Sequence, residues 1–264
     1  MIAGGTAYDL TGPADAPVLV LIHGLGLTRA TWADHVPVLA RDYRVLSYDL
    51  CGHGETTLPD RTPSLVVLSD QLCALMDALD IPRATLIGFS LGGMINRRFA
   101  MDHPDRCEGL VILNSPHERT PEAQRLVEER AAATGAGGPA ATIQETLERW
   151  FTPEFRASNT KVVNWVRDTV LANHPDNYTR HRQVLASGVV ELIRPDPPIP
   201  HPTLVMTCEN DTGSTPAMSQ GIATEIEGAE VIIVPDLQHL GLLEEPQLFL
   251  SPILGFLGRI FEKD

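Results

Sequence analysis

The sequence predicts an α/β fold in which helices cover both faces of a mostly parallel sheet, with one helical region inserted. Short apolar runs typical of buried parallel strands recur along the chain. Segments with apolar residues at helical spacing separate most of these runs. The alternation breaks once, in a long middle stretch that contains only helical patterns. With 264 residues, the chain suits one domain with an insertion.

The predicted strands and helices alternate in the first part of the chain and again near its end. Ser64 has the residue type of an N-cap, and the leucines that follow it recur on one face of a helix. A second helix is expected over residues 94–101. The six predicted strands cover residues 18–22, 44–48, 84–87, 110–113, 203–207 and 230–234.

The middle stretch predicts an inserted cap of helices, expected over residues 121–133, 142–151, 162–173 and 176–187. A proline-rich run over residues 194–202 is neither helix nor central strand and indicates the return to the sheet. We therefore expect a core over residues 1–115, a cap over 116–199 and the rest of the core over 200–264. The last helix is expected over residues 246–261, with a kink or late start at Pro252.

The composition of the chain limits the classes of partner and the cellular location that we expect. The formal net charge is -14, from 34 acidic and 20 basic residues, which disfavours nucleic acid and anionic membranes. No apolar stretch approaches the roughly 20 residues that span a bilayer, and no basic-then-apolar signal peptide opens the chain. We expect a cytoplasmic protein whose cysteines form no metal site and stay reduced and mostly buried: Cys51, Cys73, Cys107 and Cys208.

A candidate nucleophile lies directly after the predicted strand at 84–87. Residues 88–93 read Gly-Phe-Ser-Leu-Gly-Gly, which is the G-x-S-x-G pattern between a strand and a helix. The glycines at 88 and 92 allow the strand and helix to approach closely. Ser90 then sits at the start of the helix, where free N–H groups and the dipole favour negative charge. We expect Ser90 to be the nucleophile.

A serine hydroxyl needs a base, and the base needs a carboxylate to orient it. His239 follows the predicted strand at 230–234 and therefore lies at the same sheet edge as Ser90. Asp211 follows the strand at 203–207 and is the expected orienting acid, with Glu209 the second choice. Asn114 at the end of the preceding strand is not a carboxylate, so we expect no acid from there. The chain order serine, aspartate, histidine suits this fold.

Two backbone amides are expected to bind the oxyanion. The amide of Leu91 begins the helix after Ser90, and Leu25 follows His23-Gly24 after the first predicted strand. Neither His23 nor His53, which belongs to the turn after the second strand, is expected to be the base. Their glycine-rich surroundings indicate structural use.

These motifs resemble the α/β-hydrolase superfamily over nearly the whole chain. Within it, the chain looks most like the 3-oxoadipate enol-lactonase and carboxylesterase group. One departure is His-Gly-Leu-Gly at residues 23–26, where enol-lactonases often carry Ser-Leu-Gly; the form here is commoner among general esterases. The group resemblance rests on Gly92-Gly93-Met94-Ile95, the cap segment Glu148-Arg149-Trp150-Phe151-Thr152-Pro153-Glu154-Phe155-Arg156, and Thr215-Pro216.

The resemblance implies an α/β-hydrolase fold and hydrolysis of a small ester or lactone through an acyl-enzyme. It implies no metal or organic cofactor. A serine rather than an aspartate at position 90 argues against epoxide hydrolase or dehalogenase chemistry. The cap is expected to roof the pocket, with Trp150 as a pocket wall or, equally, a packing residue. The oligomeric state stays open between monomer and homodimer.

Three other functions remain open. The same three residues would also serve hydrolysis of a thioester, an amide or a carbon–carbon bond. A ligand receptor that kept the fold without turnover would bind tightly and hydrolyse negligibly. A cofactor-free oxygenase would use the histidine and aspartate but barely need the serine, so activity would survive Ser90→Ala. Fold alone does not decide among these chemistries.

Overall fold

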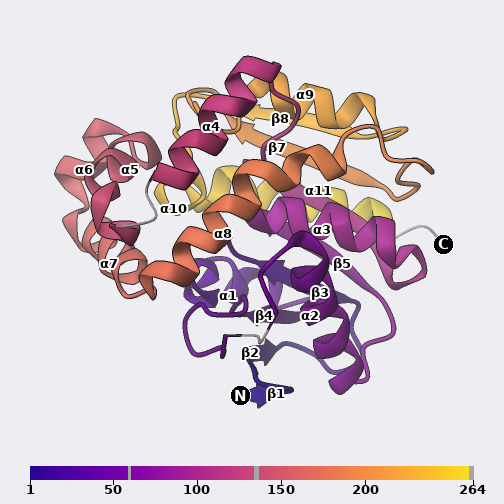
Figure 1. Ribbon diagram of the computed structural model, residues 1–264. Helices are drawn as coiled ribbons and strands as arrows, with labels where there is room; N and C mark the ends of the chain where they lie inside the picture. The colour runs from indigo at the N-terminus through magenta and orange to yellow at the C-terminus, as the bar shows by residue number, and fades with distance from the viewer. Residues whose placement is uncertain (59–60, 134–136, 262–264) are drawn as a thin grey trace.

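The computed structural model describes residues 1–58, 61–133 and 137–261. Its centre is an eight-stranded sheet in the order β1-β2-β4-β3-β5-β6-β7-β8 (Figure 1). The strands from β3 to β8 pair in parallel, as the apolar runs predict. Their bounds are β3 Val18–Ile22, β4 Arg44–Tyr48, β5 Ala84–Phe89, β6 Cys107–Leu113, β7 Thr203–Cys208 and β8 Glu230–Val234.

The edge of the sheet holds two strands that the sequence analysis missed. β1 (Ile2–Ala3) and β2 (Thr6–Thr11) are antiparallel to each other, and β2 runs antiparallel to β4. β2 reads Thr-Ala-Tyr-Asp-Leu-Thr and buries only its first half, so it lacks the continuous apolar run of a central strand.

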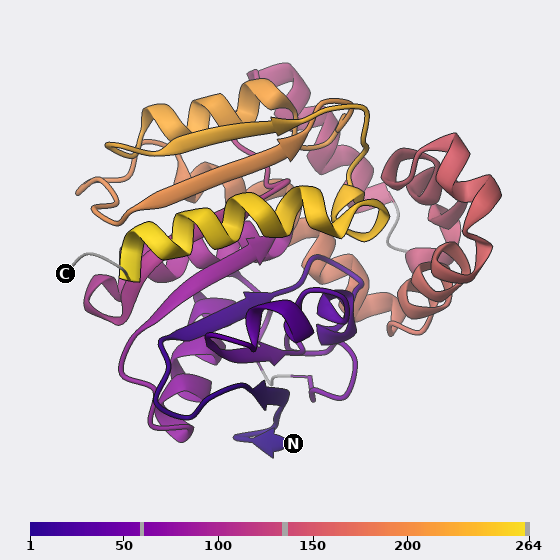
Figure 2. The same cartoon turned by 180° about the vertical axis from the view of Figure 1, so that it is seen from behind.

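Helices cover both faces of the sheet. α2 and α3 pack together on the face turned toward the viewer in Figure 1. The view from behind shows α11 lying across the opposite face (Figure 2). Ser64 is the N-cap of α2, as predicted, because its Oγ accepts a hydrogen bond of 3.2 Å from the Val67 N–H. The core helices are α1 Val36–Leu39, α2 Leu65–Ala78, α3 Leu91–Asp102, α9 Pro216–Thr224, α10 Gly241–Glu244 and α11 Pro246–Phe261.

Between β6 and β7 the described residues form helices and no strand, as the sequence predicts. Figure 1 shows α5, α6 and α7 clustered at one end of the molecule, while α4 and α8 lie over the core. The sequence analysis missed α6, a short helix that lies between two of the expected helices. The bounds are α4 Pro121–Ala133, α5 Ile143–Trp150, α6 Pro153–Ser158, α7 Thr160–Leu171 and α8 Pro175–Ser187, followed by a 3-10 helix at Gly188–Leu192.

The cysteines agree with the expectation that most of them are buried thiols. All four cysteines are free, and Cys51, Cys107 and Cys208 are buried. No helix in the described parts of the chain is long and apolar enough to cross a membrane. The proline-rich run before β7 contains neither helix nor strand.

The fold makes a testable prediction about two helical glycines. A Cβ atom on Gly92 in α3 would lie 2.1 Å from the Ile22 carbonyl oxygen, whereas one on Gly255 in α11 would meet only the flexible Arg259 side chain at 3.7 Å. Gly92→Ala should therefore lower the free energy of unfolding by roughly 3 kcal/mol. Gly255→Ala should leave it unchanged or raise it by about 0.5–1 kcal/mol. Urea unfolding checks both, and equal stability of the two variants would contradict the packing described here.

A second prediction concerns pH. His35 is buried against Trp32, and neither ring nitrogen has a hydrogen-bond partner among the described residues. Burial lowers the pKa of His35 to about 4. The unfolded chain takes up the proton near pH 6.5, so stability should fall as the pH drops from 6.5 toward 4. His35→Leu should make the loss between pH 7 and pH 5 smaller by about 2 kcal/mol.

Urea unfolding at pH 7 and at pH 5 measures this difference. His174 is exposed, so His174→Leu is the matched control and should keep the wild-type loss. If His35→Leu loses as much stability as the wild type, His35 does not stay neutral in the folded protein.

Candidate active site

Ser90 occupies a strained turn between β5 and α3. Its backbone has φ 54° and ψ -111°, a conformation that residues other than glycine rarely adopt. The neighbouring glycines make the turn possible, because a Cβ on Gly88 would lie 2.2 Å from the Gly92 carbonyl oxygen. The Ser90 N–H donates to the Leu113 carbonyl over 2.8 Å, which ties the turn to β6. The turn therefore holds the Ser90 side chain at the start of α3.

His239 lies on the loop between β8 and α10, and the structure brings it to Ser90. Its Nε2 is 3.2 Å from the Ser90 Oγ, and its Nδ1 is 2.7 Å from the Asp211 Oδ2. The rings of Phe89 and Trp150 flank the imidazole, with centroid separations of 5.0 Å and 5.9 Å. The three residues selected from the sequence thus form one continuous hydrogen-bonded chain.

Asp211 is a buried carboxylate that accepts four hydrogen bonds from described residues. Its Oδ1 accepts from the Gly213 and Ser214 N–H groups, both at 2.9 Å. Its Oδ2 accepts from His239 and, over 2.9 Å, from the Asn114 side-chain amide. Burial by itself acts to raise the pKa of Asp211, but His239 and the hydrogen bonds outweigh it, so the pKa lies below its ordinary value. Asp211 is therefore ionised near neutral pH.

Glu209, the second choice for the acid, faces elsewhere. Its Oε2 accepts a hydrogen bond of 3.2 Å from the Asp236 N–H, and its side chain is exposed. The loop after β7 thus offers Asp211, and not Glu209, to His239.

Asn114 is a site residue that the sequence analysis did not assign. It ends β6 with a left-handed φ of 45°, and its amide donates to Asp211 and, over 3.3 Å, to the Thr207 hydroxyl. The position of Asn114 in the sequence could have indicated this role. β6 pairs with β7, so the residue after β6 lies beside the loop that carries Asp211. The sequence analysis considered only whether that position held an acid.

The loop after β3 approaches Ser90 from the other side. A Cβ on Gly24 would lie 3.2 Å from the Ser90 Cβ, so Gly24 lies against Ser90. Leu27 N–H donates to the Gly24 carbonyl over 3.3 Å and closes a four-residue turn. Leu91 is the first residue of α3, where helix amides lack partners within the helix. Both predicted oxyanion donors therefore belong to backbone segments that adjoin Ser90.

His23 and His53 are structural, as the sequence analysis expected. The His23 Nδ1 donates to the Gly24 carbonyl over 2.8 Å, and its Nε2 accepts from the Leu50 N–H over 3.0 Å. Burial lowers the pKa of His23 to about 4, so it stays neutral. His53 is buried with Nδ1 3.2 Å from the Cys51 carbonyl. The hydrogen bonds of both rings go to backbone groups, whereas the Ser90 Oγ pairs with His239.

The cap is fastened to the loop that carries His239. The Leu240 N–H donates to the Trp150 carbonyl over 2.8 Å. The Glu244 carboxylate accepts from both the N–H and the hydroxyl of Thr152, over 2.9 and 2.5 Å. Trp150 is half-buried and lies beside His239, so the position predicted for a pocket wall is adjacent to the base.

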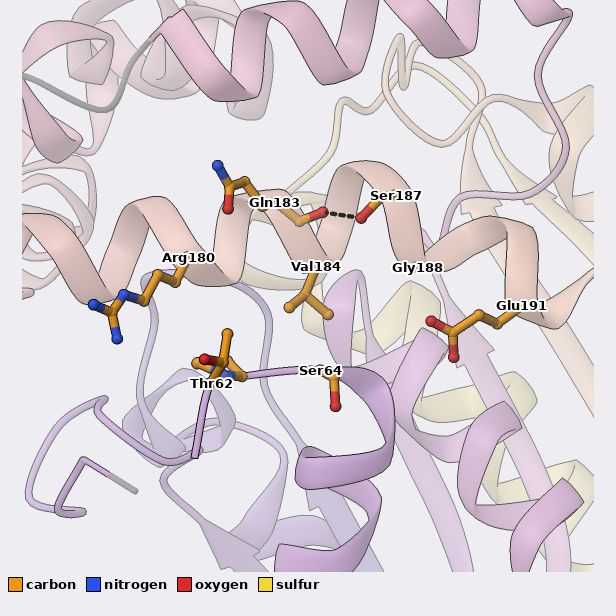
Figure 3. A pocket seen from close by; sticks show the side chains of 9 residues that line it. Thr62, Ser64, Arg180, Gln183, Val184, Ser187, Gly188 and Glu191 are labelled. Atoms are coloured by element: carbon orange, nitrogen blue, oxygen red, sulfur yellow. Dashed lines mark hydrogen bonds between the residues drawn. The ribbon is translucent and has the colours of Figure 1, made fainter. Parts of the chain in front are cut away.

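The three side chains of this hydrogen-bonded chain are buried. Ser90 is 5% exposed, Asp211 3% and His239 8%. A pocket of about 190 Å³ opens elsewhere, between the start of α2 and helix α8, and Figure 3 shows Val184 of α8 pointing toward Thr62 and Ser64, with Arg180 and Glu191 on either side. None of the residues of the proposed site lines that pocket.

Comparison with known proteins gives consistent matches over nearly the full length. Over 254 residues the chain is 28% identical to 3-oxoadipate enol-lactonase 2 of Acinetobacter baylyi, covering 96% of this chain and 92% of that protein. It is 27% identical to the (E)-2-((N-methylformamido)methylene)succinate hydrolase of the same species, covering 87% and 86%. The crystal structure of the enol-lactonase from Burkholderia xenovorans LB400 superposes with a TM-score of 0.86 at 29% identity, covering 96% of each chain.

The family match agrees with these relatives and with the resemblance seen in the sequence. The model of the alpha/beta hydrolase family matches residues 19–251, which include both halves of the core and the helices between them. The chain therefore belongs to the α/β hydrolase family and is a hydrolase.

Proposed function

We propose that this hydrolase cleaves small carboxylic esters or lactones through an acyl-enzyme on Ser90. The observation that carries the proposal is the hydrogen-bonded chain from Ser90 through His239 to Asp211. An ionised Asp211 accepts from Nδ1–H of His239, which leaves Nε2 as the acceptor for the serine proton. The similarity to an enol-lactonase supports a lactone or related ester as substrate.

In the proposed reaction, Ser90 Oγ attacks the ester carbonyl while His239 Nε2 takes the hydroxyl proton. The amides of Leu25 and Leu91 hold the negative charge that develops on the carbonyl oxygen. His239 then protonates the leaving alkoxide, and the acyl group stays on Ser90. Water that gives its proton to His239 then attacks the acyl-enzyme. As the bond to Ser90 Oγ breaks and the acid leaves, His239 returns that proton to Ser90 Oγ. In every step of the proposed reaction, the transferred proton passes through His239 Nε2.

Trp150 has a second part in the proposal. Its ring lies beside the imidazole and comes from the cap, so it would form a wall of the space in which the substrate sits. Its carbonyl also holds the Leu240 amide, one residue after the base. The residue would thus combine substrate contact with support of the His239 loop.

A second candidate substrate is an amide. The second relative named above hydrolyses a succinate that carries an N-methylformamido group. The same residues would perform that reaction, with His239 protonating a leaving nitrogen instead of an alkoxide. A panel that contains short p-nitrophenyl esters, small lactones and N-alkylformamides separates the two.

The first test of the proposed function concerns the nucleophile. Ser90→Ala should lower kcat at least about 10⁴-fold on the best substrate of the panel, because no other group supplies the covalent step. Ser219 is a buried serine in α9 whose hydroxyl has no partner among the described residues, so Ser219→Ala is the matched control and should keep wild-type activity. Turnover that survives Ser90→Ala would favour the oxygenase chemistry, and a wild type that binds but does not turn over would favour a receptor.

The second test concerns the hydrogen bond that Asn114 donates to Asp211. Asn114→Ala removes one donor from Asp211 Oδ2 and should lower kcat about 10- to 100-fold, because a hydrogen bond to a charged group contributes about 1.5–3 kcal/mol. That donor also helps to lower the pKa of Asp211. Its loss should therefore raise the pKa of Asp211.

Asn96 in α3 provides the control for losing a buried asparagine. It is fully buried, and its amide donates to the Leu86 and Val111 carbonyls, away from Asp211. Asn96→Ala should lower stability and keep kcat within about 3-fold of the wild type. If Asn114→Ala also keeps kcat within that range, Asn114 does not act through Asp211.

A further inference from the structure

The cap reaches the loop that borders Ser90 through the side chain of Asn173. Asn173 lies between α7 and α8 and is 9% exposed. Its amide nitrogen donates to the Gly26 carbonyl over 2.9 Å, a contact that joins residues 147 positions apart. The same nitrogen lies 3.0 Å from the Thr169 and Val170 carbonyls of the last turn of α7. The end of α7 therefore fixes the direction in which this amide points.

Gly26 is the residue that gives the loop its shape. It has a left-handed φ of 76° and is the third residue of the turn that Leu27 N–H closes onto Gly24. This position of a type II turn requires a positive φ, which glycine adopts without strain. A Cβ on Gly26 would lie 2.8 Å from the ring of Tyr178 in α8. Cap residues thus hold both the carbonyl and the α-carbon of Gly26.

The turn connects this contact to the proposed oxyanion hole. Leu25, whose amide is the proposed second donor, is the residue immediately before Gly26. A closed turn of four residues leaves few free dihedral angles between the Leu25 amide and the Gly26 carbonyl. Oxyanion donors must lie about 2.7–3.1 Å from the charge that develops, so a small rotation of the turn would remove their effect.

We propose that Asn173 is a positioning residue that sets the Leu25 amide by holding the Gly26 carbonyl. In this inference, which rests on the proposed function, the cap both covers the site and completes the oxyanion hole. Loss of the Asn173 contact should affect the transition state, which carries the oxyanion, more than the bound substrate, which does not.

The chain contains a matched contact for comparison. Asn177, in the first turn of α8, is 2% exposed, and its amide donates to the Gly52 carbonyl in the turn after β4. Gly52, like Gly26, has a left-handed φ, of 69°. Both asparagines therefore link the cap to the carbonyl of a left-handed glycine in a core loop, but only Gly26 belongs to the turn beside Ser90.

The experiment compares Asn173→Ala with Asn177→Ala on a p-nitrophenyl ester that the wild type hydrolyses. It measures kcat, KM and the inhibition constant of a trifluoromethyl ketone of the same acyl group, which forms an oxyanion on Ser90. Asn173→Ala should lower kcat about 10- to 100-fold and weaken ketone inhibition by a similar factor, with KM within about 3-fold. Asn177→Ala should change kcat and ketone inhibition by less than about 3-fold, even if its Tm falls as far as the Tm of Asn173→Ala.

A third variant covers the case in which Asn173→Ala does not fold. Asn173→Asp keeps the shape of the side chain and replaces the donating NH₂ with an accepting oxygen. It should lower kcat and weaken ketone inhibition at least as much as the alanine variant. Ser90→Ala in the same series tests the proposed function itself.

The outcomes separate the inference from the proposed function. If hydrolysis survives Ser90→Ala, the proposed function fails and this inference fails with it. If hydrolysis depends on Ser90 but the Asn173 variants behave like Asn177→Ala, the inference alone is overturned. Parallel losses in kcat and ketone inhibition that are confined to the Asn173 variants support it.

Discussion

One left-handed residue between β5 and α3 is the constraint on which the rest of the site depends. Ser90 adopts a φ of 54°, and the close packing of Gly88 against Gly92 and of Gly92 against the end of β3 maintains it. Such strain persists only where the surrounding structure requires it. The turn places the serine hydroxyl at the start of α3, 3.2 Å from His239 Nε2 and close to Gly24 of the loop after β3. A relaxed turn would separate all three.

A buried charge organises the other side of the site. Asp211 has almost no contact with water, and a carboxylate in that position is stable only with donors around it. The donors come from its own loop, from His239 after β8 and from Asn114 after β6. Three adjacent strands therefore contribute to one ionised group. The hydrogen bond to His239 keeps the imidazole in the tautomer and orientation that the proposed proton transfer requires.

The sequence predicted the central part of the fold well because its signals are local. Continuous apolar runs identified β3 to β8, and the glycine pattern identified the turn at Ser90. β2 was not predicted, because an antiparallel edge strand with half of its residues exposed has no such apolar run. The contacts of Asn114 and Asn173 were not predicted for a different reason. Asn114 contacts a residue 97 positions away and Asn173 one 147 positions away, and no local sequence pattern encodes such contacts. The cap's helices were predictable, but their attachment to the loops at Gly26 and Leu240 was not.

The cap and the core meet at the two loops that the proposed chemistry needs, one carrying His239 and one carrying Leu25. The central claim is that Ser90 carries the acyl group during turnover. The most direct measurement is mass spectrometry of protein quenched with acid during steady-state hydrolysis of p-nitrophenyl acetate, followed by peptide mapping. The account predicts one acetyl group per chain, located on Ser90. Turnover of the same ester without an acyl group on Ser90, or with the acyl group on another residue, would contradict it.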